Sequence, residues 1–297
     1  MYAKTSKWPV SRAVIHLLLL ACSILFLIPL WAVLAISVSN ETDIMTMGFR
    51  LIPGRLDLTA YAYIFKNPSV ILQGYKVTIL MSAAGLVLYL VMASMIAYAL
   101  SQREFAYRRG VTFYLFFTML FNGGLAPLYI LMTQYLHLRD TYAALIIPLL
   151  GNVWYLFIIR TSFQQIPAAI IESAKIDGAT ELQIYFRLIL PLSKPVLATV
   201  GLLQLLGNWN SWFPALLYIN KSDMYPLQYL LQTILRNMQE LTRSMENKPA
   251  QIVESIQVPT ESMRMAMAVI AVGPMLFIFP FFQKYFVKGL TVGSVKG

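Results

Sequence analysis

Six apolar stretches separated by polar segments dominate the pattern of this chain of 297 residues. None of them contains Asp, Glu, Lys or Arg, and each has about the 20 residues that a helix needs to cross the core of a bilayer. Because lipid offers no partner to an unpaired backbone group, such segments are expected to be helical. The pattern predicts an all-α, polytopic membrane protein with six transmembrane helices, at residues 13–36, 77–100, 111–136, 141–159, 195–219 and 265–283.

The distribution of charge between the polar segments predicts the orientation. If the N-terminus is inside, the inside segments hold 13 of the 23 basic residues and only four acids, a net charge of +9. The outside segments, which are longer in total, then carry a net charge of +1. Short loops rich in Lys and Arg remain in the cytoplasm, so both termini are predicted to be cytoplasmic.

Composition narrows the class of protein further. The chain is 58% hydrophobic and 12% charged, against about 45–50% and about 25% in soluble domains. Its net charge of +10 is explained by the charge bias of membrane proteins, so no nucleic-acid partner is expected. One cysteine and two distant histidines offer no metal cluster. No P-loop pattern occurs, so no cofactor is expected on this chain, and any energy from ATP must come from a partner.

Domain boundaries are weakly marked. Residues 1–70 are expected to hold the first span and an external loop, residues 71–290 the transmembrane domain, and residues 291–297 a C-terminal tail. Two long polar segments, 37–76 and 220–264, are expected outside the membrane. The second has helical character before Pro249.

The largest inside loop, residues 160–194, is expected to form two helices joined by a corner. Pro167 suits a helix start, Gly178 permits a left-handed exit, and residues 180–183 (Thr-Glu-Leu-Gln) match a capping box that opens the second helix. Its apolar side chains could dock in a groove of another protein or lie on the membrane surface. The residues alone leave both interpretations open.

A spaced motif in this loop resembles the signature of the permease subunits of binding-protein-dependent ABC importers. The motif Glu-x-Ala-x3-Gly-x9-[Ile/Leu]-x-Leu-Pro is filled at the right spacing, with Ser173 in place of the usual Ala as a mild departure. The residues that fill it are Glu172, Ala174, Gly178, Leu188, Leu190 and Pro191. Residues 208–216 and 283–297 also resemble carbohydrate permeases of the maltose-transporter type, in the subgroup that serves oligosaccharides from polysaccharides.

The resemblance implies a subunit of an importer in the bacterial cell membrane that takes up a sugar or oligosaccharide. Its expected partners are a second, different permease, two ATPase subunits that carry ATP and Mg, and an extracellular sugar-binding protein. The loop would couple the chain to an ATPase through Glu172, Ser173, Ala174, Asp177, Gly178 and Ala179. The tail from Lys288 to Gly297 is also expected to reach the ATPases.

Helix-breaking residues inside the spans indicate kinks, either around a polar cavity or packed against neighbouring helices. Sugars present hydroxyl edges and flat C–H faces, so amides and aromatic rings suit them. The proposed path residues are Asn208, Trp209, Asn210 and Trp212, with Asn122 and Asn152 as weaker candidates. The depth of Trp209 fits an interfacial aromatic belt equally well.

Three alternatives stay open. The first is an ABC permease for a non-sugar solute. The second is an ion-coupled secondary transporter, which usually carries intramembrane carboxylates that these spans lack. The third is a membrane enzyme, for which no nucleophile–base or metal arrangement is present in the sequence.

Overall fold

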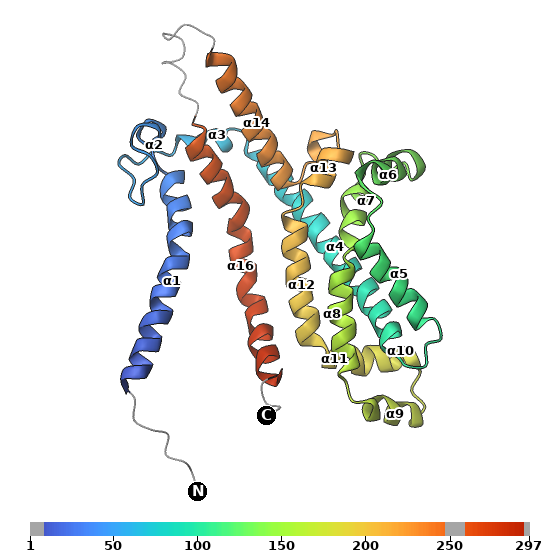
Figure 1. Ribbon diagram of the computed structural model, residues 1–297. Helices are drawn as coiled ribbons and strands as arrows, with labels where there is room; N and C mark the ends of the chain where they lie inside the picture. Colours follow the sequence, from blue (N-terminus) through green and yellow to red (C-terminus); the bar gives the residue numbers. More distant parts are fainter. Residues whose placement is uncertain (1–8, 247–258, 294–297) are drawn as a thin grey trace. The chain divides into compact units, whose positions relative to one another are not determined.

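The computed structural model describes residues 9–246 and 259–293, and this part of the chain forms helices and no named strand. Three helices are long and apolar enough to span a membrane, or six segments if each bent pair forms one span. The three long helices are α1 (Pro9–Ser37), α4 (Pro68–Ser101) and α16 (Glu261–Gly293), which cover the predicted first, second and sixth spans (Figure 1).

The remaining predicted spans are broken. The third consists of α5 (Arg108–Leu120) and α6 (Leu125–Ile130), which continues into a π-helical turn, and the two arms differ in direction by 111°. The fourth consists of α7 (Tyr142–Ile146), a 3-10 turn and α8 (Val153–Gln164), bent by 50°. The predicted fifth span ends early, because α12 (Lys194–Trp209) stops before the separate helix α13 (Phe213–Tyr218). The kinks predicted from the helix-breaking residues are confirmed in these spans, because the breaks lie at or beside Gly, Asn and Pro, which interrupt the hydrogen-bond ladder.

The inside loop contains α9 (Ala168–Ile176) and α10 (Glu181–Ile184), and α10 continues through a π-helical turn (Tyr185–Ile189) into α11 (Leu190–Leu192). The second external segment forms α14 (Leu227–Glu246), which confirms the expected helix before Pro249. Two short helices, α2 (Glu41–Met47) and α3 (Thr59–Ile64), follow α1.

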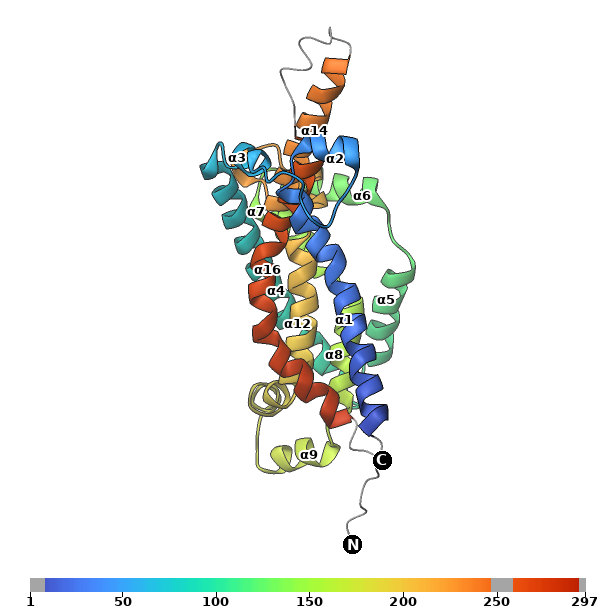
Figure 2. The same ribbon diagram turned by 90° about the vertical axis from the view of Figure 1, so that its left-hand side faces the viewer.

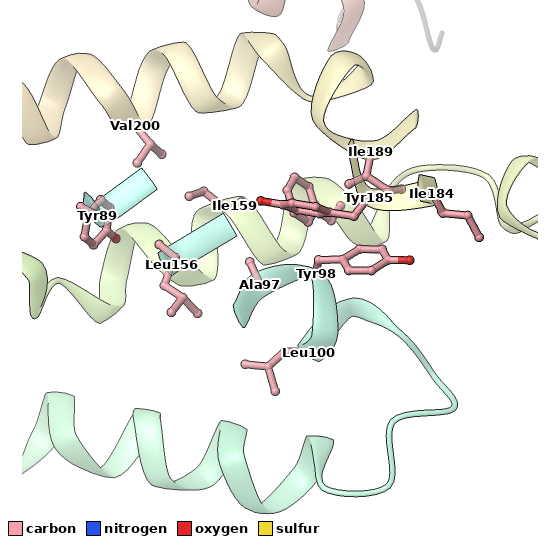
Figure 3. Packing of buried hydrophobic residues seen from close by; sticks show 12 residues of the cluster. Tyr89, Ala97, Tyr98, Leu100, Leu156, Ile159, Ile184, Tyr185, Ile189 and Val200 are labelled. Carbon is pink, nitrogen blue, oxygen red and sulfur yellow. The ribbon is translucent and has the colours of Figure 1, made fainter. Parts of the chain in front are cut away.

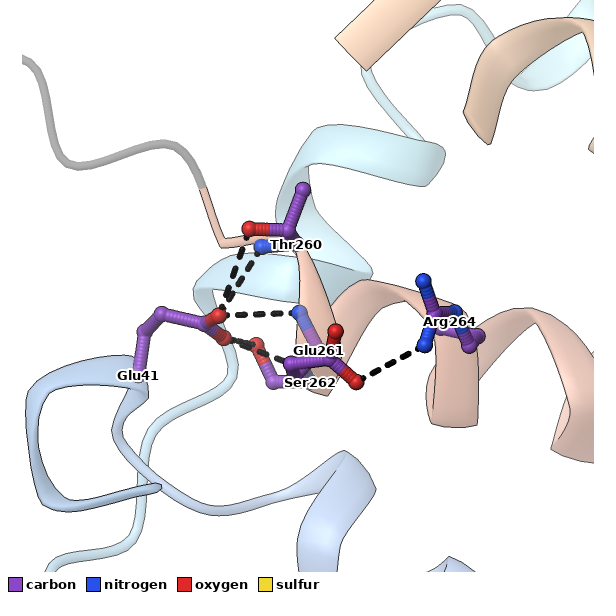
Figure 4. Close-up of polar contacts among 5 residues, drawn as sticks. All are labelled: Glu41, Thr260, Glu261, Ser262 and Arg264. Carbon is purple, nitrogen blue, oxygen red and sulfur yellow. Dashed lines mark hydrogen bonds and ion pairs between the residues drawn. The ribbon is translucent and has the colours of Figure 1, made fainter. Parts of the chain in front are cut away.

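The chain divides into two compact units, residues 1–68 with 233–272 and residues 69–232 with 273–297. In the first unit, the carboxylate of Glu41 caps the start of α16 (Figure 4). Glu41 Oε1 accepts from the backbone N–H of Glu261 at 2.8 Å, and Oε2 accepts from the N–H of Ser262 at 3.0 Å and its hydroxyl at 2.7 Å. A negative charge at a helix N-terminus satisfies free N–H groups and matches the helix dipole.

The second unit contains the core that positions the inside loop. Its buried cluster joins α4, α8 and α12 to the π-helical turn after α10 (Figure 3). Ile184, Tyr185 and Ile189 are each at most 3% exposed, and the rings of Tyr98 and Tyr185 lie 5.4 Å apart. Burial of such side chains is worth about 1.5–3 kcal/mol each, so the second helix of the loop is anchored in the core of the spans.

Candidate functional site

The corner between α9 and α10 is built from local backbone hydrogen bonds. Gly178 has φ of 79°, and its N–H donates to the carbonyl of Lys175 at 3.0 Å. The N–H of Ala179 donates to the carbonyl of Ala174 at 2.9 Å. This pair of bonds is a Schellman motif, which ends a helix at a left-handed residue. The expected glycine corner is therefore confirmed.

The second helix opens with the predicted capping box. The backbone N–H of Thr180 donates to Gln183 Oε1 at 2.9 Å, and the N–H of Gln183 donates to the Thr180 hydroxyl at 3.4 Å. Pro167 immediately precedes α9 as its N-cap. Figures 1 and 2 both show α9 beyond the lower ends of α8 and α12, with α6 at the opposite end of this unit. In Figure 1, α13 also lies at that opposite end.

The two faces of α9 differ in what they contact. Ile171 and Ala174 pack against the core cluster, whereas Ile176 is 86% exposed and Ile170 is 36% exposed. The sequence suggested that the apolar residues of this loop, Ile170, Ile171, Ala174 and Ile176, are all available as one contact surface. That expectation was wrong, because two of the four pack against the core. The exposed side of the corner instead combines Ile176 with polar or small residues, namely Glu172, Ser173, Asp177 and Gly178. Ala179 is half-buried.

A polar network ties α9 to the end of α4. The amine of Lys175 lies 2.9 Å from Glu104 Oε2 and 3.0 Å from Glu181 Oε1. The hydroxyl of Tyr98 donates to Glu181 Oε2 at 2.5 Å. The hydrogen bond from Tyr98, followed by that from Lys175, lowers the pKa of Glu181, and the bonds to Glu104 and Glu181 raise the pKa of Lys175. Both groups are therefore charged at neutral pH.

A second feature is a polar hollow of about 600 Å³ where the broken fourth span meets α12. Among the described residues, its lining includes amides and hydroxyls but no Asp, Glu, Lys or Arg. The side chain of Asn152 caps α8 by accepting from the N–H of Tyr155 at 3.3 Å. Trp154, on the lining, is 62% exposed. A neutral, amide-bearing lining with an aromatic ring has the chemistry to contact hydroxyl groups and C–H faces.

The proposed path residues occupy different environments. Asn208 lines the hollow but is 1% exposed, and its amide donates to the carbonyl of Ser82 at 3.2 Å. Trp209 is 3% exposed, with its ring 6.4 Å from that of Tyr75. Asn210 is exposed and bonds to the carbonyl of Leu206 at 2.9 Å. Of the six, only Asn152 and Asn208 line the hollow.

The other two candidates lie elsewhere. Trp212 is 36% exposed beside Phe213. Asn122 is exposed, and its side chain accepts from the N–H of Gly124 at 2.9 Å in the turn between α5 and α6. The path assignment remains a prediction for all six residues.

Several residues of these two sites were missed in the sequence. Gln204 donates to the carbonyl of Leu149 at 2.7 Å and to Asn208 Oδ1 at 2.9 Å, and so holds α12 against the break in the fourth span. Trp154 stands two residues after Asn152 in a breaker-rich segment, a signal that could have identified it. Lys175 lies inside the motif, but its partner Glu104 is 71 residues away and no local pattern connects them.

Comparison with known proteins agrees with this geometry. Residues 90–292 match the family described as "Binding-protein-dependent transport system inner membrane component". The chain is 36% identical over 279 residues to the polygalacturonan/rhamnogalacturonan transport system permease protein YtcP of Bacillus subtilis (strain 168), covering 94% of this chain and 96% of YtcP. It is 38% identical over 284 residues to the protein LplC of the same organism, covering 93% and 94%.

A solved structure shares the fold. A chain of a bacterial ABC transporter involved in the import of the acidic polysaccharide alginate matches with a TM-score of 0.76 and 27% identity, covering 96% of this chain and 99% of that one. Sequence and fold thus agree over nearly the whole length. The chain belongs to the family of binding-protein-dependent transport system inner membrane components, and it is a membrane permease subunit of the ABC importer type rather than an enzyme.

Proposed function

We propose that this permease takes up a sugar or oligosaccharide, driven by ATP hydrolysis on two partner ATPase subunits that hold ATP and Mg. A second, different permease and an extracellular sugar-binding protein complete the importer. Both termini and the α9–α10 loop face the cytoplasm. The observation that carries the proposal is the α9–α10 corner, whose exposed face has no role in the chain's own core while its inner face is anchored to the spans.

The corner is suited to transmit motion to the spans. An ATPase that grips the exposed face, at Glu172, Ser173 and Asp177, would displace α9. The ion pairs of Lys175 and the anchored π-helical turn carry that displacement to the end of α4 and to α12. Coupling requires that the ATP-bound ATPases favour one arrangement of the permease by a differential free energy.

Sugar as the substrate class is supported by the names of several relatives. YtcP is named for polygalacturonan and rhamnogalacturonan transport, and the protein AraQ of Bacillus subtilis, 28% identical, for arabinooligosaccharides. These names include both acidic and neutral sugars. The neutral lining of the hollow is compatible with contacts to hydroxyl groups, which the two kinds share.

The first experiment is a gentle purification of the tagged chain from native membranes and identification of its partners. We expect a second permease and an ATPase to copurify, and the ligand of the associated binding protein then names the substrate. Recovery of the folded chain alone would contradict the importer assignment and favour a self-sufficient transporter.

With the substrate known, Trp154→Ala tests the hollow. We expect uptake to fall several-fold while the partners still copurify, because the ring lies on the lining. Tyr114→Ala is the matched control, since Tyr114 is 65% exposed on α5 and does not line the hollow. Equal uptake by both variants would move the sugar contacts to the partner permease.

A further inference from the structure

Three arginines meet in a separate hollow of about 310 Å³. Arg108 and Arg109 stand at the first turn of α5, and Arg160 lies near the end of α8. Thr112, Phe113 and Phe116 complete the lining. The α5 and α8 helices pack against each other, and these ends lie at the same end of the unit as α9 (Figure 1).

The charge in this hollow is not neutralised by the described part of the chain. Among the described residues, the ion pairs involve Lys175 and Arg264. None of them involves the three arginines of the hollow. Arg160 uses its Nε to donate to the carbonyl of Leu100 at 3.2 Å, which fixes the guanidinium but supplies no negative charge. The Thr112 hydroxyl is shielded from solvent and has no hydrogen-bond partner. The hollow therefore offers excess positive charge and an unused hydroxyl.

The surroundings of the hollow are apolar. Phe113 is 69% exposed and Phe116 is 50% exposed, and the whole of α5 has no buried residue. Arg108 precedes the apolar run of the third span, and Arg160 directly follows that of the fourth. The arginines thus stand where spans leave the hydrocarbon, with exposed aromatic rings on the hydrocarbon side.

We propose that this hollow binds the phosphate of an anionic phospholipid, with the acyl chains against Phe113 and Phe116. Guanidinium groups form paired, charge-assisted hydrogen bonds to phosphate oxygens. Basic pockets between transmembrane helices are suited to anionic headgroups. A soluble phosphate has no apolar part that could contact the rings of Phe113 and Phe116, whereas a lipid has acyl chains. These rings therefore favour the lipid. The site lies apart from the hollow proposed for sugar, and the two share no lining residue.

The test uses the complete importer, purified in detergent and depleted of lipid. Binding of dioleoyl-phosphatidylglycerol and of dioleoyl-phosphatidylcholine is measured by native mass spectrometry. We expect the parent protein to prefer phosphatidylglycerol and Arg108→Gln/Arg109→Gln to weaken its binding by on the order of tenfold. Arg103→Gln/Arg187→Gln is the matched control, because it removes the same charge from exposed arginines at the same end and should leave the binding unchanged.

Two further arms separate the alternatives. Arg160→Lys keeps the charge but loses the planar donor pair, and a several-fold loss of phosphatidylglycerol binding with unchanged thermal stability would support the proposal. An equal loss in the control variant would assign the effect to general surface charge and overturn it. Binding of inorganic phosphate as tightly as the lipid would also overturn the proposal. The absence of lipid binding, because a partner subunit fills the hollow, would overturn it as well.

Discussion

At the scale of single residues, Gly178 decides the shape of the corner between α9 and α10. Its φ is 79°, and a Cβ at this position would meet nothing within 4 Å. A substitution therefore acts through the backbone alone, and a left-handed L-residue costs about 1–2 kcal/mol, least for Asn. We expect Gly178→Asn to keep transport, and Gly178→Pro, which fixes φ near −65°, to abolish it while the protein still inserts in the membrane. Uptake and copurified ATPase measure this, and full uptake by Gly178→Pro would refute the role of the corner.

The second prediction at this scale concerns pH. Because the native pKa of Glu181 is lowered, chiefly by the hydrogen bond from Tyr98, its contribution to stability is present above the ordinary pKa of 4.5 and is lost as the pH falls through the native value. Because the native pKa of Lys175 is raised, its contribution is complete below the ordinary 10.5 and is lost at higher pH. The network is therefore intact between these limits.

Tyr98→Phe tests this window. The variant removes the first cause of the shift, so the pKa of Glu181 should move back toward its ordinary value. Thermal unfolding of the purified subunit between pH 6 and pH 3 should then show a weaker loss of stability on acidification than in the parent protein. Identical pH profiles would show that the hydrogen bond does not contribute.

Local signals explain which residues of the site could be predicted. Gly178 and Thr180 act through neighbours in the chain, so their roles were evident from the sequence. Lys175 meets Glu104 only after α9 has packed near the end of α4. Arg108 and Arg160 come to line one hollow only after α5 has packed against α8. The burial of Trp209 likewise depends on α4, which supplies Tyr75. Its place in the sequence fitted a path residue and an interfacial aromatic belt equally well.

At the scale of elements, the two faces of α9 allow a matched pair of variants. Ile176→Ser changes a side chain that is 86% exposed, so stability should stay within about 0.5 kcal/mol while less ATPase copurifies. Ile171→Ser changes the inner face, which packs against the core, so it should lower the thermal midpoint of the subunit. If Ile176→Ser retains the full amount of ATPase, the exposed face is not the contact.

The packing of α4 against α12 gives a second prediction for elements. A Cβ on Gly85 would lie 3.0 Å from Asn208 Nδ2, an amide already held by the carbonyl of Ser82. Gly85→Ala should therefore destabilise the subunit by about 1–3 kcal/mol. Gly201→Ala is the control on the same pair of helices, because its Cβ would meet Leu90 at an ordinary 3.4 Å. Thermal unfolding distinguishes them, and equal midpoints would contradict the close approach.

The sequence predicted the positions of the helices along the chain better than the angles between successive helices. Apolar length located the three long candidate spans and the helices that make up the broken ones, because hydrophobicity depends on composition alone. Asn122, Gly123 and Gly124 also marked a break. The size of the turn there, 111°, depends on which neighbours the two arms contact, and no residue pattern contains that information.

At the scale of the whole molecule, the features of the second unit are ordered along its length. Figure 1 shows α9 and the adjoining ends of α5 and α8 at one end, and α6 and α13 at the other. Those ends of α5 and α8 carry the arginines of the hollow. This order is consistent with the proposed coupling, in which an ATPase moves the charged end at α9 and the helices around the neutral hollow rearrange.

The last prediction concerns which end of this unit faces the cytoplasm. In the chain expressed without its ATPase subunits, and with Cys22 replaced by Ser, single cysteines are introduced as Ser173→Cys on α9 and Ser222→Cys after α13. Positive loops remain in the cytoplasm, so a membrane-impermeant maleimide should label Ser222→Cys in intact cells and Ser173→Cys only after permeabilisation. The reverse pattern would place α9 outside the cell, where no ATP is available, and would remove the physical basis for coupling through Gly178.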